Sequence, residues 1–521
     1  MSSLGAQLAS LHSKSTKNPG AILATSKRKS DVVGRGVTHS AQHGHALKKS
    51  NFKPSVLYED SKAASDVPLT TLRENAFSSV HQLVVVDTDF DQYLSLVNLQ
   101  SLQSERGQLT KEENQDLNKS IRGLLNLIGS VLQESSSRSP TSIYSSCLHV
   151  LEYLLRRHDV HLRNAQDLLV AILPHHDDIL FGRVVQLVDL ASMPTFNFLR
   201  PYAAAGNGTP SRTILAKQAA KDAALFKIFC QSAQFLKNKQ RRGASMVISF
   251  SCAVVVESLT LQARATGTLE ESTVRVLMPF IQQACASQQG GDWRGFGYVV
   301  TSTLADHAEL STQVLEKLAK AVIKGGVDMD ALTLVMAILP KKTTALQKVD
   351  KTIKGLDLPK SVFQGLTCVD SIEVMLGQLN QEVNVTPLVA TLLDLGLQHK
   401  MFDFVTTLVS GQSLESLWKE NSLIASVAAT IVNLVAENTV EPDDVLSLLE
   451  ALRKTASSAC DKGIAHSVML HRKSNKPTKE RIAKTLGVQV STSKDEEPLL
   501  LCNSLLNCYI RTMTICLGGG D

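Results

Sequence analysis

The feature that most constrains this chain is an apolar stripe with the period of an α-helix, repeated between short breaks. Apolar residues recur at positions i, i+3, i+4 and i+7, and residues at that spacing form one face of an amphipathic helix. Prolines such as Pro279 and Pro442 stand where a stripe stops or starts, and strand-like alternation is nearly absent. The pattern predicts an all-α chain. The clearest stripes lie at 121–132, 144–155, 180–188, 315–323 and 445–452.

The breaks between the stripes are short, and they predict how the helices are connected. A chain of 521 residues is too long for one compact core, whereas in a solenoid each repeat needs only its neighbours. Amphipathic helices joined by short turns over roughly 400 residues indicate a HEAT/armadillo-like α-solenoid of antiparallel helix pairs. A large irregular helical bundle is the alternative. The breaks are expected at 135–140, 206–212, 287–295, 324–328 and 437–442.

Positive charge is concentrated at the start of the chain. Residues 1–53 hold nine Lys and Arg side chains and the single acid Asp31, although the whole chain carries only +5. Because this stretch is rich in Ser, Lys, His and Gly and lacks a sustained period, we expect it to be largely disordered. The predicted organisation is a basic arm at 1–55, a helical-repeat solenoid at 56–460, and a basic loop with terminal helices at 461–521.

Two basic stretches are candidate contacts for RNA phosphates or for nuclear import. Lys and Arg side chains bind phosphates by releasing counterions, without reading sequence. A solvated charged face is the alternative for both stretches, and for the second it is the favoured one. The candidates are Lys27, Arg28, Lys29, Lys48 and Lys49 in the arm, and Arg472, Lys473 and Lys476 further on, followed by Lys479, Arg481 and Lys484.

Potential metal ligands cluster twice. The His-His-Asp-Asp segment at 175–178 could supply ligands, but consecutive helical residues point in different directions and rarely converge on one ion. Asp177 and Asp178 instead suit the N-terminus of the next helix, where carboxylates accept hydrogen bonds from free N–H groups. The histidines of HSAQHGH at 39–45 have no surrounding structure to orient them. We therefore predict neither a metal nor another cofactor.

Several classes of protein are disfavoured by what the sequence lacks. It contains no GxSxG elbow, no GxxxxGK[ST] loop and no HExxH motif, so we do not expect an enzyme. The nine cysteines form no CxxC unit, and most fall in apolar runs, which predicts reduced core thiols. The first residues lack the apolar core of a signal peptide. We judge the most apolar stretch, 246–261, too short and too polar to span a membrane, and expect a soluble protein.

A block at 151–190, LEYLLRRHDVHLRNAQDLLVAILPHHDDILFGRVVQLVDL, resembles the U3 small nucleolar RNA-associated protein 10 family. The opening MSSLGAQLASL, the segment 53–76 and the segment 208–229 are similar to family blocks in the same order. The family-matching residues are Tyr153, Arg156, Arg157, His161, Asn164, Pro174, Phe181 and Arg183, together with Leu154, Leu173 and His175. Independently, the periodicity predicts a buried core of Leu151, Leu154, Leu155, Leu168, Leu169, Ile172 and Val184.

The resemblance implies a non-catalytic subunit of the UtpA (t-Utp) part of the small-subunit processome, in the nucleolus of the nucleus. Its partners would be the other UtpA subunits, including β-propeller proteins, the 5′ external transcribed spacer of pre-rRNA and the U3 snoRNP, with no membrane. The family is linked to 18S rRNA maturation and to RNA polymerase I transcription of rDNA. Since its members are several times longer, this chain would be an N-terminal portion or a shortened form. A karyopherin-like or other adaptor solenoid that binds protein cargo is the alternative.

Overall fold

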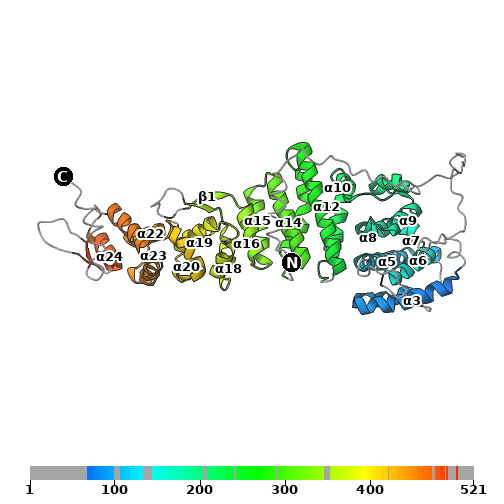
Figure 1. Cartoon of the computed structure of the whole chain (residues 1–521), viewed down its shortest axis with the longest axis horizontal. Coiled ribbons are helices and arrows are strands. Elements are labelled where there is room, and N and C mark those ends of the chain that lie inside the picture. Colours follow the sequence, from blue (N-terminus) through cyan, green and yellow to red (C-terminus); the bar gives the residue numbers. More distant parts are fainter. Residues whose placement is uncertain are drawn as a thin grey trace, which may run out of the picture. The chain divides into compact units, whose positions relative to one another are not determined.

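The computed structural model describes residues 67–98, 106–132, 143–203, 208–239, 242–288, 291–344, 346, 353–420, 422–471, 474, 476–486, 488–490 and 500–502. Most of these residues, 79%, lie in α-helices or short 3₁₀ turns, so the predicted all-α, HEAT-like array of helix pairs is confirmed (Figure 1). The chain divides into two compact units. The first holds the chain up to Phe280 together with Gly290–Ala308, and the second holds Ile281–Gln289 together with the chain from Glu309 onward.

The first unit is built from α-helices of four to 25 residues, some of them linked by 3₁₀ turns. In chain order its elements are α3 (Leu69–Val86), η1 (Thr88–Tyr93), α4 (Leu94–Val97), η2 (Arg106–Gln108), α5 (Lys111–Val131), α6 (Ile143–His158), α7 (Val160–Arg163), α8 (Ala165–Ile172), η3 (Leu173–His175), α9 (Ile179–Leu187), η4 (Leu190–Ser192), η5 (Pro194–Tyr202), α10 (Arg212–Ala219), α11 (Ala223–Phe235), α12 (Arg242–Thr266), the first part of α13 (Glu271–Cys285) and α14 (Gly291–His307).

Helix α5 illustrates how local sequence fixes these elements. It begins with a capping box, in which Thr110 accepts a hydrogen bond from Glu113 N, and the Glu113 carboxylate accepts one from Thr110 N. Its predicted stripe, from Ile121 to Leu132, is fully buried. The helix packs on α8, while α3 packs on α6. The predicted core of Leu151, Leu154, Leu155, Leu168, Leu169, Ile172 and Val184 is buried at every position.

The longest helix of the first unit, α12, corrects one expectation. The segment Gly243–Thr266 is long and apolar enough, by length and composition alone, to cross a membrane, so the judgement that it is too short and too polar was wrong. In the structure α12 packs against α5, α10, α11 and α14. Its buried Ser258 donates hydrogen bonds to Val254 O (2.6 Å) and, in α10, to Ala216 O (3.0 Å). Four neighbouring helices and internally bonded hydroxyls are typical of the central helix of a helical array.

The second unit continues the alternation of helices and short turns and adds two small β-ribbons. Its elements are the end of α13, α15 (Thr312–Lys324), α16 (Met329–Ile338), β1 (Lys341–Thr343), β2 (Lys354–Leu356), α17 (Lys360–Thr367), α18 (Ile372–Leu379), α19 (Thr386–Gln398), α20 (Phe402–Ser410), η6 (Gln412–Leu414), α21 (Glu415–Glu420), α22 (Leu423–Ala436), α23 (Pro442–Leu470), α24 (Lys476–Leu486), β3 (Val488–Val490) and β4 (Leu500–Cys502).

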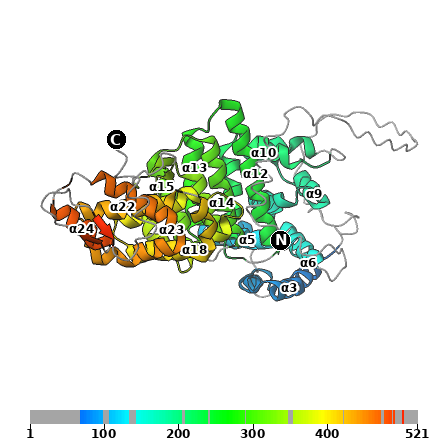
Figure 2. The same ribbon diagram turned by 60° about the vertical axis from the view of Figure 1, so that its left-hand side comes forward.

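Helices α22 and α23 form the most closely packed pair of this unit, and Figure 2 shows them side by side. Helix α22 is buried at most positions, and α23 begins with Pro442 in its first turn, as predicted for the break at 437–442. A methyl group added at Gly463 would lie 2.0 Å from Ala425 O. Glycine is therefore what allows the backbones of the two helices to approach so closely. Helix α23 kinks at Ala456, where φ is −152° and ψ is 78°.

Two of the expected interruptions are wrong. Pro279 lies inside α13 instead of at a helix end, although it has no N–H to give to the helix. Its neighbours Leu277 and Ile281 are fully buried, and this packing offsets the missing hydrogen bond. The break expected at 287–295 is shorter than predicted, because α14 already begins at Gly291. Trp293 is buried and stacks on Phe296 at 5.1 Å, which stabilises helix in a segment whose glycines favour a loop.

The two β-ribbons were also not predicted from the sequence pattern. Strands β1 and β2 pair antiparallel, with Lys341 opposite Leu356 and Thr343 opposite Lys354. Strands β3 and β4 pair in the same sense, with Val488 opposite Cys502. Each strand has only three residues, too few for alternation to be visible in the sequence. The expectation of a chain with almost no strand content is otherwise met among the described residues.

The described cysteines match the prediction of reduced core thiols with one exception. Those whose side chains are described are free, and most of these are buried, whereas Cys368 is exposed. Burial raises the pKa of the Cys230, Cys252 and Cys460 thiols to about 12. A thiol with so high a pKa carries almost no thiolate at neutral pH, so these three side chains act as small apolar core residues.

Candidate functional site

The basic side chains proposed from the sequence fall largely outside the part of the chain that the structure describes. This applies to the arm, with Lys27, Arg28, Lys29, Lys48 and Lys49, and to the histidines at 39–45. It also applies to Arg472 and Lys473 in the second stretch. Lys476 begins α24, but its side chain is not among those described. Their roles remain predictions.

Two of the remaining residues of the second basic stretch, Arg481 and Lys484, are engaged within the fold. Arg481 on α24 donates to Val435 O (3.2 Å) and Ala436 O (2.8 Å), the last carbonyls of α22. A guanidinium at this position adds hydrogen bonds to the last carbonyls of the helix and complements the helix dipole. Lys484 forms an ion pair with Asp443 at the start of α23 (2.9 Å). For these two residues the geometry favours a structural role over phosphate binding.

Two residues of the family-matching block at 151–190 accept hydrogen bonds from a buried guanidinium that was not predicted from the sequence. Arg106 donates to His158 O (2.5 Å) at the end of α6 and to Asn164 Oδ1 (2.8 Å) at the start of α8. It also hydrogen-bonds Asn118 on α5. Burial, together with the nearby Arg163, lowers the pKa of Arg106 from its usual value. Its partners are 12 to 58 residues away in the sequence, so no local pattern could have identified it.

The same network continues through Asn164 to the surface. The Asn164 amide donates to Asp167 Oδ2 (3.1 Å), and Asp167 Oδ1 accepts from Arg122 Nε (2.8 Å) on α5. Arg122 is 62% exposed and Asp167 only 17%, so the network runs from the interior to solvent along the α5–α8 contact. Asn164 thus lies at its centre, orienting helices and not facing a ligand.

The other family-matching residues also belong to the interior of this region. Tyr153 is buried, its ring meets His158 edge to face at 5.8 Å, and burial raises its pKa. Arg156 donates to Val67 O (2.9 Å), tying α6 to the residues that precede α3. Phe181 is fully buried in α9, and Pro174 occupies the first turn of η3. Arg157, His161 and Arg183 are half-buried.

The His-His-Asp-Asp segment does not converge on one point. His175 Nε2 lies 2.7 Å from Gly129 O on α5, and burial lowers the pKa of this ring. Asp178 caps α9 by accepting from Leu180 N (2.8 Å) and also accepts from Tyr144 Oη (3.0 Å), as the capping interpretation predicted. Within the described ranges, no group of three or more His, Cys, Asp and Glu side chains is placed to hold a metal ion.

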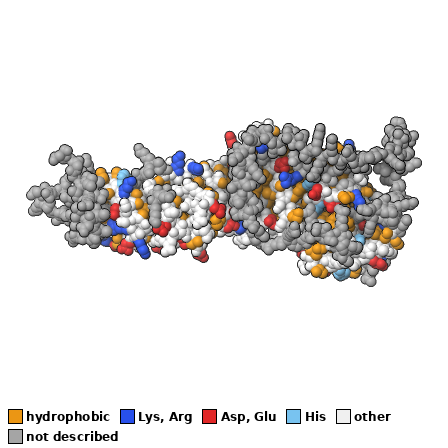
Figure 3. All heavy atoms as spheres, viewed as in Figure 1, with side chains coloured by type: hydrophobic (Ala, Val, Ile, Leu, Met, Phe, Trp, Pro, Cys, Tyr) orange, Lys and Arg blue, Asp and Glu red, His pale blue; other side chains and the backbone are white. Residues whose placement is uncertain are grey.

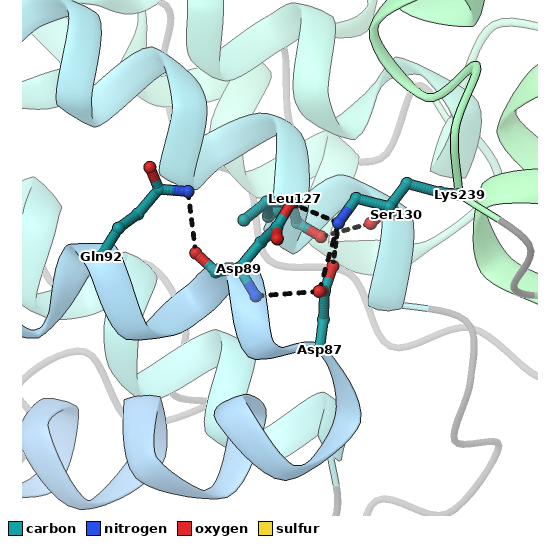
Figure 4. Close-up of polar contacts among 6 residues, drawn as sticks. All are labelled: Asp87, Asp89, Gln92, Leu127, Ser130 and Lys239. Atoms are coloured by element: carbon teal, nitrogen blue, oxygen red, sulfur yellow. Dashed lines mark hydrogen bonds and ion pairs between the residues drawn. The ribbon is translucent and has the colours of Figure 1, made fainter.

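A second polar cluster, here called the charged clasp, consists of Asp87, Asp89 and Lys239 (Figure 4). Lys239 Nζ lies 2.9 Å from Asp87 Oδ2 and 3.2 Å from Asp87 Oδ1, and it also contacts the Asp89 carboxylate. Asp87 in turn caps η1 by accepting from Asp89 N (2.9 Å). The clasp joins the end of α3 to the α11–α12 junction, across 152 residues of sequence. An ammonium between two carboxylates has little capacity left for an anion, so the clasp is structural.

This arrangement defines the class of protein: an α-helical repeat array of HEAT type, whose polar residues in the family block serve helix packing. The family model described as U3 small nucleolar RNA-associated protein 10 matches residues 273–395. This segment runs from α13 into α19 and lies outside the blocks from which the resemblance was read. The resemblance to that family is confirmed.

Curated relatives agree with this assignment. An uncharacterised protein of Arabidopsis thaliana is 29% identical over 364 residues, which cover 67% of this chain and 15% of that protein. The U3 small nucleolar RNA-associated protein 10 of Coccidioides immitis is 23% identical over 402 residues, covering 75% of this chain and 20% of the relative. The HEAT repeat-containing protein 1 of Homo sapiens is 22% identical over 351 residues, which cover 65% of this chain and 15% of that protein. The chain therefore matches only a minor part of each relative's length.

Proposed function

We propose that this chain is a non-catalytic scaffold segment of a U3 small nucleolar ribonucleoprotein assembly that acts in ribosome biogenesis. The match of residues 273–395 to the U3 small nucleolar RNA-associated protein 10 model is the observation that carries the proposal. The fold supports it, because an array of helix pairs presents long surfaces to several partners and gains rigidity from nearest-neighbour packing. In the family block, the polar residues whose bonds are described support helices, which is what a scaffold requires.

The finer proposal follows the family. The chain would reside in the nucleolus, contact β-propeller subunits of UtpA, and act on the 5′ external transcribed spacer of pre-rRNA during maturation toward 18S rRNA. A link to RNA polymerase I transcription belongs to the same proposal. The arm at 1–55, with Lys27, Arg28 and Lys29, would bind phosphates or direct import, and Arg472, Lys473 and Lys476 would add a second contact.

A pull-down of the tagged chain from nucleolar extract tests the proposal. We expect recovery of UtpA β-propeller subunits and of U3 snoRNA, the former surviving nuclease treatment. A variant with Lys27, Arg28 and Lys29 changed to Glu distinguishes the role of the arm from that of the helical array. We expect this variant to keep its protein partners and to lose either RNA binding or nucleolar residence. Recovery of unrelated protein cargo without processome components would contradict the proposal and favour a karyopherin-like adaptor.

A further inference from the structure

The β1–β2 ribbon is an interruption of an otherwise helical unit, and it is held in place by specific contacts. Thr391 on α19 accepts a hydrogen bond from Leu356 N (2.6 Å) and lies 3.3 Å from Leu356 O. A methyl group added at Gly355 would meet Thr391 Oγ1 at 2.3 Å and Thr344 Cγ2 at 2.8 Å. Strand β2 is therefore seated directly on α19. So close a fit fixes the position of the ribbon on the array.

The seated ribbon presents three exposed lysines, with Lys341 and Lys354 on one face and Lys342 on the other, because neighbouring residues of a strand point to opposite faces. All three residues of β1 are exposed, whereas Gly355 and Leu356 of β2 are buried and only Lys354 is exposed. Lys341 and Lys354 make no ion pair within the described ranges, and Lys342 pairs with Asp357 at 3.1 Å. That pair is 66% and 43% exposed, so solvent screens it and an incoming anion can compete for the ammonium. Figure 3 shows Lys and Arg side chains standing out where Figure 1 labels β1.

A polar cleft lies next to the ribbon. It has a volume of about 400 Å³ and is lined mainly by the α18–α19 connection and the start of α21. Thr386 lines it, and the next residue, Pro387, has its carbonyl oxygen 3.5 Å from the position of a Gly355 methyl group. The cleft therefore begins within one residue of the ribbon's seat on α19. Its lining residues are Asn380, Gln381, Glu382, Val383, Asn384, Thr386, Ser416 and Leu417.

We propose that the β1–β2 ribbon and the adjoining cleft together bind single-stranded RNA, with the phosphates on Lys341, Lys342 and Lys354. Ammonium groups bind phosphates as point charges without reading sequence. The Asn and Gln amides of the cleft can donate to and accept from ribose hydroxyls and the edges of unpaired bases. The choice of RNA over an acidic peptide rests on the function proposed above. This site is separate from both basic stretches considered from the sequence.

The competing explanation is that the lysines only protect an exposed strand edge. Lysine on an edge strand discourages pairing with another chain, and such a role needs no ligand. The two explanations differ in what neutralising the lysines does. Loss of an RNA site weakens RNA binding in a salt-dependent way, whereas loss of edge protection promotes self-association and leaves RNA binding unchanged.

The experiment compares two triple variants of the full chain with fluorescein-labelled oligouridine as the probe. K341Q/K342Q/K354Q neutralises the ribbon, and K317Q/K320Q/K324Q removes the same charge from three exposed lysines of α15 in the same unit. Each lost phosphate contact lowers the magnitude of the slope of log affinity against log salt by about 0.7 for a single strand. We expect a decrease of about 2 for the ribbon variant and little change for the α15 variant.

Four results would overturn the proposal: equal decreases in both variants, no decrease in either, self-association of the ribbon variant with unchanged affinity, or displacement of the RNA by oligoglutamate as readily as by unlabelled oligouridine. Equal decreases in both variants would show that net charge, and not the ribbon, determines RNA affinity. Displacement by oligoglutamate would show that an acidic peptide is the better partner. Light scattering and circular dichroism establish oligomeric state and folding for each variant. Because recovery of UtpA subunits is measured separately, failure of this site is distinguishable from failure of the scaffold function.

Discussion

The region around α5–α8 and the α22–α23 pair solve the same packing problem with two devices in different proportions. In the first, charged and amide side chains link elements far apart in sequence, through the Arg106 network and the charged clasp, and Gly129 also lets α5 approach the backbone of α8 at Ala171 O. In the second, Gly463 lies against Ala425 O, and Ser467 and His471 hydrogen-bond Asn433 Oδ1. Side-chain networks specify which helices meet, but burying their polar groups costs desolvation free energy. Close packing of two backbones gains dispersion energy and leaves no room for a larger side chain. A helical repeat array can therefore be joined by either device.

The largest expected effect tests what both regions share, which is an apolar interior. Leu155 on α6 is only 2% exposed, and Leu155→Ala should lower the free energy of unfolding by about 2–5 kcal/mol through lost burial and a residual cavity. Leu162→Ala, at a position 64% exposed on α7, is the matched control and should change it by less than about 0.5 kcal/mol. Hydrogen exchange read peptide by peptide is the measurement. Equal protection of α6 in the Leu155→Ala chain and in the parent would show that this helix does not depend on its core face.

The close approach of α22 and α23 predicts that a single methyl group has opposite effects at two glycines. Gly463→Ala places a methyl carbon 2.0 Å from Ala425 O, so the helices must move apart, at a cost of about 1–3 kcal/mol. Gly182→Ala on α9 meets nothing within 4 Å and should stabilise the chain by about 0.5–1 kcal/mol through helix propensity. Thermal melts and exchange protection of α22 and α23 would measure both. If Gly463→Ala stabilised the chain as well, the contact between the two helices would be looser than described.

The charged clasp predicts a smaller loss in the first unit. Lys239→Met keeps the apolar stem but leaves the Asp87 carboxylate, whose side chain is only 7% exposed, without its ammonium. Allowing for the 20% exposure of Lys239, we expect destabilisation of about 1–2 kcal/mol, seen as faster exchange in α3 and at the start of α12. The control is Lys119→Met, since the Lys119–Asp116 pair is more than three-quarters exposed on both sides and should contribute little. If Lys239→Met and Lys119→Met changed stability and exchange to the same extent, the charged clasp would make no special contribution to the first unit.

These two regions also show what the sequence could and could not predict. The stripe of α5 and its capping box are local, so periodicity and the Thr110–Glu113 spacing suffice to locate them. The Arg106 network and the clasp depend on residues brought together by tertiary packing, and no spacing rule identifies them. Gly291 and Gly295 favour a loop, but burial of Trp293 stabilises a helix in this segment. The ribbon lysines were missed because three-residue strands carry no readable alternation.

The smallest predicted effect is a pH dependence that arises from the histidine packed against α5. Burial lowers the pKa of His175, against the opposing influence of its hydrogen bond to Gly129 O and of Asp178 and Asp177. Its folded pKa therefore lies below the unfolded value of about 6.5. As pH falls through about 6.5 the unfolded chain gains a proton that the folded ring does not accept. The stability contributed at this site is complete above that pH and is lost below it, by at most about 1.4 kcal/mol per pH unit.

His175→Gln tests this dependence, because the Gln amide nitrogen can reach the position of His175 Nε2 and donate to Gly129 O but does not titrate. Between about pH 7.5 and 5.5, the fall in the urea midpoint followed by circular dichroism should be shallower than in the parent chain. His81→Gln, at an exposed position on α3, serves as the control for the substitution itself. The α22–α23 pair belongs to the other compact unit, so exchange protection there should be insensitive to the substitution. A parallel decline in both chains would show that the buried imidazole does not set the acid sensitivity of the first unit.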